Sequence, residues 1–329
     1  MPPHIPLRKL GKSDLSVSAV GLGCWQFAQG RGLFGDYWGT LENAEILEIV
    51  RLSLEGGINW FDTAEAYGGG RSERVLSESL KALGVKPPGV IIATKWRPLF
   101  RTARSIPQTI DARLEALGGY PIALYQVHQP TSFSTVRAQM EAMADLVEAG
   151  KIRWVGVSNF SAKRMRAAHE ALRRRGLPLV SNQVRYSLLD RRIETNGVLE
   201  TARELGVSII SYSPLAQGIL TGKFHERPEL IRSKPGYRKY MRAFRPAGLE
   251  ESWPLIQALR EKAEKYGRTP AEIALNWLIN AHGEVVVAIP GATSAAQARG
   301  NAGSLAFTLS GEDIDFLGCI SAPKIPGKT

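Results

Sequence analysis

The chain has 329 residues, enough for one large domain or two ordinary domains with a buried core. Its composition, 44% hydrophobic and 22% charged, is that of a globular protein, and no stretch reaches the ~18 uninterrupted apolar residues of a membrane helix. The N-terminal residues lack a secretory pattern, so we expect a cytoplasmic protein. Cys24 and Cys319 are too few for a disulfide framework or a four-ligand zinc site, and we expect no metal.

The net charge is +11, from 42 Lys and Arg against 31 Asp and Glu, which favours anionic partners. Part of the excess lies between Lys223 and Arg245. This run is either a solvated loop or a clamp for a phosphate-bearing ligand. Nucleic acid is not expected, because the sequence has no zinc-finger spacing, no RNA-recognition signature and no basic stripe interleaved with aromatic residues.

Short β-branched runs alternate with longer amphipathic segments, a pattern typical of parallel strands that are each followed by a covering helix. The expected strands are 17–22, 58–61, 90–94, 122–127, 153–157, 179–184, 208–211 and 285–289. The expected helices are 43–55, 72–83, 107–117, 135–148, 161–174, 197–205, 269–280 and 294–302. Thr269-Pro270 with Glu272 is a helix-start signal, and Ser161 is a candidate cap.

This count of strand and helix pairs predicts a (β/α)8 TIM barrel, with residues 1–329 as a single domain. Two additions lie outside the repeat: a long loop after Tyr212 with a helix near 250–266, and a C-terminal helix from about 310. The alternative is an open doubly wound sheet, which would carry a Gly-x-Gly-x-x-Gly turn after its first strand. The segment that begins at Gly21 lacks the third glycine.

Four polar residues follow the expected strands and would meet at the carboxyl-terminal mouth of a barrel. Asp62, Lys95 and His128 end the second, third and fourth strands, and Tyr67 lies five residues after Asp62. Each alone could be an ordinary cap, a solvated charge or a structural histidine. Together they would concentrate ionisable groups at one rim, where burial shifts pKa values.

Several motifs in chain order make the sequence resemble the aldo-keto reductase superfamily from about residue 7 to 315. They are Gly57-Ile-Asn-Trp-Phe-Asp62-Thr-Ala-Glu-Ala-Tyr67-Gly, Ala93-Thr-Lys95, Leu124-Tyr-Gln-Val-His128, Gly156-Val-Ser-Asn159-Phe and Ser211-Tyr-Ser-Pro214-Leu-Ala-Gln-Gly218. Within the superfamily the chain is most similar to bacterial oxidoreductases and potassium-channel β-subunits. The resemblance implies the same barrel.

The resemblance also implies that Tyr67 is the general acid that protonates a carbonyl oxygen during hydride transfer. A free phenol has a pKa of about 10, and a neighbouring Lys95 ammonium is expected to lower it. Asp62 would hold Lys95 charged, and His128 would orient the carbonyl by a hydrogen bond.

By the same resemblance, a further set of residues is assigned to the nicotinamide cofactor. The set is Trp25, Asp62, Ser158, Asn159, Gln183, Tyr212, Ser213, Pro214, Leu215, Ala216, Gly218, Lys223, Gly291, Thr293, Gln297 and Asn301. Tyr212 is expected to stack on the nicotinamide ring. The helix that follows Pro290 would favour anions at its N-terminus.

Two positions depart from the pattern of the family. Several relatives place Lys or Arg where this chain has Thr293 and Ser294, so NADP(H) is favoured but NAD(H) is possible; Arg232 and Lys234 are candidate replacements. Thr131 stands where many relatives have Asp, with little expected effect on the chemistry.

The predicted function is NAD(P)H-dependent, reversible reduction of aldehydes or ketones to alcohols. Trp25, Tyr67, Trp96 and His128 are expected to bind the substrate, with Phe34, Tyr37 and Trp38 adding to an aromatic wall. The alternatives are a nucleotide-binding regulatory subunit with vestigial activity and a Schiff-base aldolase that uses Lys95. The expected partner is a small carbonyl or alcohol substrate, without nucleic acid or membrane; no oligomeric state is predicted.

Overall fold

The computed structural model describes residues 5–28, 39–232 and 237–322, and its centre is a sheet of parallel strands in sequence order. The strands are β3 (Leu22–Gly23), β4 (Trp60–Asp62), β5 (Ile91–Trp96), β6 (Leu124–Val127), β7 (Trp154–Ser158), β8 (Leu179–Arg185), β9 (Ser208–Tyr212) and β10 (Val286–Ala288). The sheet curls until its ends meet: Val20 bridges Ala288, and Gly23 bridges Gly291, both in parallel. The predicted (β/α)8 barrel is therefore confirmed.

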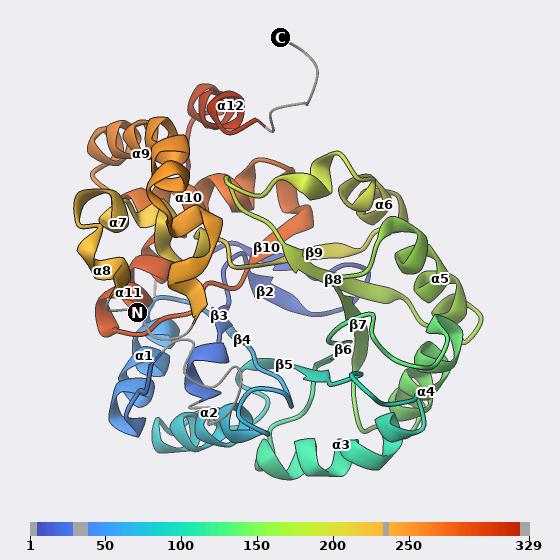
Figure 1. Ribbon diagram of the computed structural model, residues 1–329. Helices are drawn as coiled ribbons and strands as arrows, with labels where there is room; N and C mark the ends of the chain where they lie inside the picture. The colour runs from blue at the N-terminus through green and yellow to red at the C-terminus, as the bar shows by residue number, and fades with distance from the viewer. Residues whose placement is uncertain (1–4, 29–38, 233–236, 323–329) are drawn as a thin grey trace.

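Helices surround the strands in Figure 1, which looks along the barrel. The covering helices are α1 (Asn43–Glu55), α2 (Arg71–Ala82), α3 (Ser105–Ala116), α4 (Val136–Glu148), α5 (Ala162–Arg173), α6 (Val198–Leu205), α10 (Pro270–Asn280) and α11 (Ala295–Gly303). One hydrophobic cluster between strands and helices extends from Ala19 to Leu317, so the described residues form a single domain. Thr269 and Glu272 form the predicted capping box at the start of α10, and Ser161 caps α5.

The additions to the repeat lie where the sequence predicts them, but the loop after β9 contains short helices. These are η3 (Ala216–Thr221), α7 (Lys223–Glu226), α8 (Glu229–Arg232), η4 (Tyr237–Tyr240) and η5 (Arg242–Phe244). The long helix α9 (Pro246–Tyr266) begins four residues earlier than expected, with proline in its first turn, and α12 (Gly311–Ile320) ends the fold. In Figure 1, α7 and α8 lie on the same side of the barrel as α11.

The prediction of a single first strand over residues 17–22 is wrong. Residues 16–18 form β2 (Ser16–Ser18), which pairs in antiparallel with β1 (Leu7–Lys9), and the chain joins the barrel only after it, through the Val20 bridge to Ala288 and through β3. Apolar residues continue through both pieces, so periodicity could not separate them. Gly21 lies between the two pieces, where a Cβ atom would come within 2.3 Å of the Trp60 indole.

The β1 and β2 hairpin closes the amino-terminal end of the barrel. Leu10, Leu15 and Val17 pack with Trp60, which begins β4, and with Val180 near the start of β8. The Trp60 indole N–H donates to the Ser18 carbonyl at 2.9 Å. The hairpin therefore fills the floor of the barrel with apolar side chains and leaves its opposite end open.

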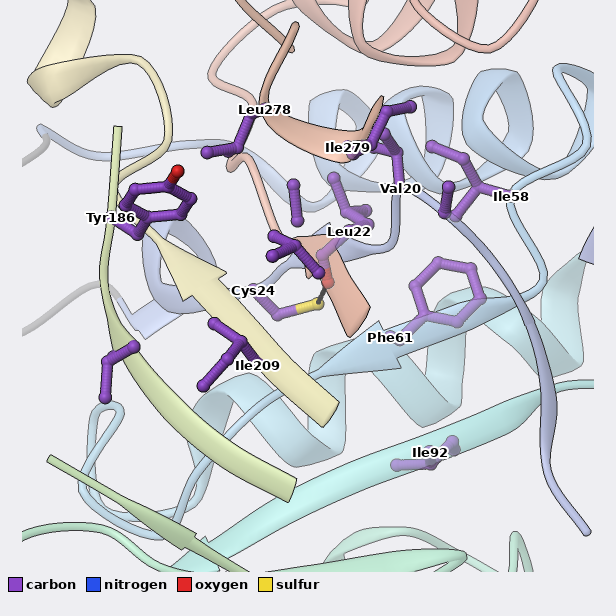
Figure 2. Close-up of a cluster of buried hydrophobic side chains, with 14 of the residues drawn as sticks. Val20, Leu22, Cys24, Ile58, Phe61, Ile92, Tyr186, Ile209, Leu278 and Ile279 are labelled. Atoms are coloured by element: carbon purple, nitrogen blue, oxygen red, sulfur yellow. Dashed lines mark hydrogen bonds between the residues drawn. The ribbon is translucent and has the colours of Figure 1, made fainter. Parts of the chain in front are cut away.

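The space between the strands and the outer helices is also filled by apolar side chains, and Figure 2 shows part of it. The labelled side chains come from the barrel strands, from residues just before or after them, and from α10: Val20, Leu22, Cys24, Ile58, Phe61, Ile92, Tyr186, Ile209, Leu278 and Ile279. The buried Cys24 thiol donates to the Leu22 carbonyl at 3.5 Å. This packing fixes the ends of β3 and β4, from which the polar residues of the mouth project.

The hairpin gives a matched test of the barrel floor. Leu15 is 3% exposed and Leu7, on the same hairpin, is 50% exposed. We expect Leu15→Ala to lower the free energy of unfolding by about 2 to 4 kcal/mol because it leaves a cavity. Leu7→Ala should change it by less than about 0.5 kcal/mol. Urea unfolding followed by circular dichroism measures both, and equal effects would contradict the role of the hairpin as a floor.

Candidate active site

A buried ion pair lies at the mouth of the barrel, between the ends of two neighbouring strands. The Lys95 ammonium donates to Asp62 Oδ1, to the Thr63 carbonyl at 2.8 Å and to the Tyr67 hydroxyl at 3.4 Å. The side chains of Lys95 and Asp62 are 0% and 1% exposed. An ammonium has three donors, so all the hydrogen-bonding capacity of Lys95 is used and its nitrogen is aimed at the phenol.

Two glutamines complete the environment of Asp62. Gln126 and Gln183 donate their side-chain N–H groups to Asp62 Oδ2, at 3.1 and 2.8 Å. Gln126 carries no predicted role, although it lies on β6 two residues before His128 and so points to the same face. Gln183 was expected to hold the nicotinamide carboxamide; in this structure it lines the open cleft and also holds the carboxylate.

Burial and neighbouring charges shift the pKa values of this cluster in opposite directions. Burial alone would lower the pKa of Lys95, but the charge of Asp62 and then Tyr67 outweigh it, and the net shift is upward. Burial raises the pKa of Tyr67 above its usual value, although Lys95 opposes the rise. Lys95 thus lowers the Tyr67 pKa as expected, but desolvation of the phenol outweighs this effect in the net shift. Tyr67 is therefore a protonated phenol at neutral pH.

His128 lies against Tyr67, with the two rings edge to face at 5.5 Å between centroids. Burial, with the charges of Lys95 and Arg97, lowers the pKa of His128 to about 3. The imidazole is therefore neutral at physiological pH and can donate one N–H hydrogen bond. On the other side, Trp25 stacks against Tyr67 at 6.2 Å.

Asp62, Tyr67 and His128 border a cleft of about 1330 Å³ that extends to α11, and Lys95 lies buried behind them. Most of the predicted cofactor residues line it: Trp25, Asp62, Ser158, Asn159, Gln183, Tyr212, Ser213, Pro214, Leu215, Gly218, Lys223, Gly291, Thr293, Gln297 and Asn301. Six further residues that carry no predicted role also line the cleft: Gln26, Arg97, Leu99, Gln129, Arg185 and Thr221. They belong to no quoted motif.

The middle of the cleft has polar groups that are oriented by one another. The Tyr212 hydroxyl donates to Asn159 Oδ1 at 2.9 Å, and Asn159 Nδ2 donates to Ser158 Oγ at 3.0 Å. Asn159 has a φ of 61°, and Ser213 just beyond β9 has a φ of 51°. Positive φ in non-glycine residues is strained and concentrates at functional sites.

The far end of the cleft fits an anionic group. Ser294 caps the N-terminus of α11, and Gln297 Oε1 accepts from the Thr293 backbone at 2.8 Å. A helix N-terminus of this kind favours anions, and Lys223 lines the same cleft. Gln26 Oε1 is buried without a hydrogen-bond partner in the described part of the chain, and its side chain packs against Gly291. The unpartnered Gln26 Oε1, on a cleft that extends from Tyr67 to α11, fits a polar, extended ligand such as a dinucleotide.

The comparisons with known proteins agree with this geometry. Residues 19–319 match the sequence profile of the Aldo/keto reductase family. The chain belongs to this family. It is 38% identical to an uncharacterized oxidoreductase of Mycobacterium tuberculosis over 302 residues, 92% of this chain and 88% of that protein. It is 34% identical to the chloroplastic pyridoxal reductase of Arabidopsis thaliana, over 95% of this chain and 86% of that one.

A solved structure supports the fold of this aldo-keto reductase independently. The glycerol dehydrogenase of Gluconobacter oxydans superposes with a TM-score of 0.82 at 26% identity, over 98% of this chain and 99% of that one. Oxidoreductase activity and the barrel thus follow from the family. Among the described residues no helix is long and apolar enough to cross a membrane, and no His, Cys, Asp and Glu cluster could hold a metal ion.

Several site predictions need correction. Trp96 does not border the cleft: its ring is 0% exposed in the core, and its indole N–H donates to Ser105 Oγ at 3.0 Å. Ala216 belongs to the strained turn after β9 but does not line the cleft. Arg232 is exposed and away from the cleft lining. The predictions for Phe34, Tyr37, Trp38 and Lys234 lie outside the described residues.

The low pKa of His128 predicts a pH effect on stability. An unfolded histidine has a pKa of about 6.5. Between pH 6.5 and 3, His128 is therefore protonated in the unfolded chain but neutral in the folded protein. Acid therefore destabilises the fold. Relative to His128→Gln, the wild-type free energy of unfolding should fall by about 2 kcal/mol from pH 7.5 to 5, as measured by urea unfolding. Parallel pH profiles for the two proteins would show that His128 titrates normally.

Proposed function

We propose that this protein reduces aldehydes or ketones to alcohols with NADPH, and that Tyr67 is the general acid. The observation that supports this best is the hydrogen-bonded series from Asp62 through Lys95 to Tyr67, whose side chain lines an open cleft. A nicotinamide cofactor would supply the hydride. The residues of the chain would bind and polarise the carbonyl and provide the proton.

The carbonyl oxygen would lie between the Tyr67 hydroxyl and the neutral His128 imidazole. His128 would donate a hydrogen bond that stabilises the negative charge developing on the oxygen. As that charge grows, Tyr67 would transfer its proton to the oxygen, and the adjacent Lys95 ammonium would stabilise the phenolate left behind. Asp62 would keep Lys95 charged in a site where burial favours its neutral form.

Cofactor contacts follow from the cleft lining. Tyr212 would stack on the nicotinamide ring, and Ser158 and Asn159 would hold its carboxamide, with Gln183 shared between that group and Asp62. The turn from Ser213 to Gly218 would enclose the pyrophosphate. Thr293, Gln297 and Asn301 would contact the adenosine part at α11.

The preference for NADPH over NADH rests on charge. In the described part of the cleft lining, Asp62 is the only carboxylate, and it is paired with Lys95. Sites specific for NAD commonly place a carboxylate on the ribose hydroxyl, which a 2′-phosphate would repel. Lys223 provides a positive charge in the cleft instead.

The aldolase alternative is not supported by the surroundings of Lys95. A Schiff-base nucleophile must be a neutral amine, whereas Asp62 raises the Lys95 pKa against the effect of burial, and three acceptors surround the ammonium. The presence of all four polar residues, Asp62, Tyr67, Lys95 and His128, also favours an active enzyme over a regulatory subunit with vestigial activity.

Tyr67→Phe tests the acid. We expect the turnover number with NADPH and an aromatic aldehyde to fall by about 10² to 10⁴, because general acid catalysis is lost. Nucleotide affinity, measured by quenching of tryptophan fluorescence, should stay within threefold of wild type. Turnover within a few fold of wild type would remove Tyr67 from the mechanism.

The cofactor proposal has its own test in a fluorescence titration with both nucleotides. NADPH should bind at least about tenfold more tightly than NADH, and Lys223→Ala should reduce that ratio because a charge-assisted contact is lost. Arg232→Ala, which removes a charge on α8 away from the cleft, is the matched control and should leave the ratio unchanged. Equal affinities in the wild type would overturn the NADPH preference.

A further inference from the structure

The substrate end of the cleft carries a positive charge that neither the reduction chemistry nor the cofactor contacts use. Arg97 follows β5 by one residue, two positions after Lys95, and it lines the cleft together with Leu99 and Thr131. It is close enough to His128 for its charge to act on the imidazole. Its guanidinium is exposed at the mouth, where a substrate would enter.

Glu65 holds the main chain of Arg97 but forms no ion pair with its guanidinium. Glu65 Oε2 accepts from the Arg97 backbone N–H at 3.0 Å, while Glu65 Oε1 accepts from Arg101 Nη1 at 2.6 Å. The Glu65 carboxylate thus neutralises Arg101 and holds the main chain of Arg97. Within residues 5–28, 39–232 and 237–322, no carboxylate forms an ion pair with Arg97.

The other described residues that line the mouth offer no compensating charge either. Asp62, the one acid in the described cleft lining, is buried against Lys95, so its charge is already balanced. Arg185, the last residue of β8, adds a second guanidinium to the lining and is half-buried. Two guanidinium groups in the lining of one cleft give it a positive potential that attracts an anion.

We propose that the substrate of this reductase carries an anionic oxygen group, a carboxylate or a phosphate, that Arg97 binds while the carbonyl lies between Tyr67 and His128. The inference rests on the proposed carbonyl reduction and adds the class of substrate. A guanidinium presents paired N–H donors that match either anion. Arg185 reinforces the positive potential at the mouth. Binding an anion at one end fixes the carbonyl at the other, so Arg97 determines specificity.

Two matched pairs of substrates test this in steady-state kinetics with NADPH. The carboxylate pair is 4-carboxybenzaldehyde and its neutral methyl ester, and the phosphate pair is glyceraldehyde 3-phosphate and glyceraldehyde. In at least one pair, the wild-type kcat/KM should be about 10 to 100 times higher for the anionic member, the range expected of a charge-assisted hydrogen bond. The pair with the larger ratio identifies the anion.

Arg97→Leu should reduce that ratio to within about threefold of unity, through a loss of kcat/KM for the anionic member. The control is Arg164→Leu. Arg164 is another exposed arginine near the mouth, but its guanidinium donates to the Pro130 carbonyl at 2.8 Å and does not line the cleft. Since this variant removes the same charge outside the cleft, it should keep the wild-type ratio.

The outcomes separate the two levels of the proposal. The anion site would be wrong if the wild type reduced the neutral and anionic members at equal rates. It would also be wrong if Arg97→Leu kept the wild-type ratio of kcat/KM values. Either result would leave carbonyl reduction intact. An equal loss of the ratio in Arg164→Leu would overturn a specific contact at Arg97, because only net charge would then matter. Absence of turnover with all four compounds, at saturating nucleotide, would remove the proposed function and this inference together.

Discussion

The site depends on one interaction, the buried ion pair between Asp62 and Lys95. Both side chains are almost wholly inaccessible, and an isolated charge at that depth would neutralise instead of remaining ionised. The pair is tolerated because every group has a partner: Gln126 and Gln183 on the carboxylate, the Thr63 carbonyl and Tyr67 on the ammonium. Its value lies in placing a permanent positive charge beneath a phenol, more than in any contribution to stability.

The barrel supplies the geometry for that pair. Neighbouring parallel strands deliver Asp62 and Lys95 to the same end, and the next strand brings His128 beside them. The hairpin closes the opposite end with apolar residues, so polar groups gather only at the mouth. Beyond β9, positive φ angles at Ser213 and Gln217 mark a turn whose strain is stabilised by the surrounding fold and whose residues line the cleft.

Sequence patterns predicted the barrel, its covering helices and the four polar residues at its mouth, because strand alternation and helix caps are local signals. They could not separate β2 from β3, since apolar residues run through both pieces. They also misplaced Trp96. Trp96 is the last residue of β5, so its side chain points to the face opposite that of Lys95, outward into the core, where it contacts Ser105.

Electrostatic details were the least predictable part of the site. A charge beside a phenol was expected to lower its pKa, but the loss of hydration in the cleft acts more strongly on Tyr67. Arg97 belongs to no motif and becomes noticeable only when Glu65 is seen to be shared between Arg101 and the main chain. Pairing of charges across loops depends on three-dimensional proximity, which residue spacing does not encode.

The most direct test of the role of the pair is the single-turnover rate of aldehyde reduction by Asp62→Asn at saturating NADPH, followed as a function of pH. Without the carboxylate, burial would lower the pKa of Lys95, so the rate should fall as pH rises through that lowered value and lie about 10² below wild type at neutral pH. Circular dichroism and nucleotide affinity would verify that the variant folds. A folded variant with a rate within threefold of wild type at every pH would contradict the central role of the ion pair.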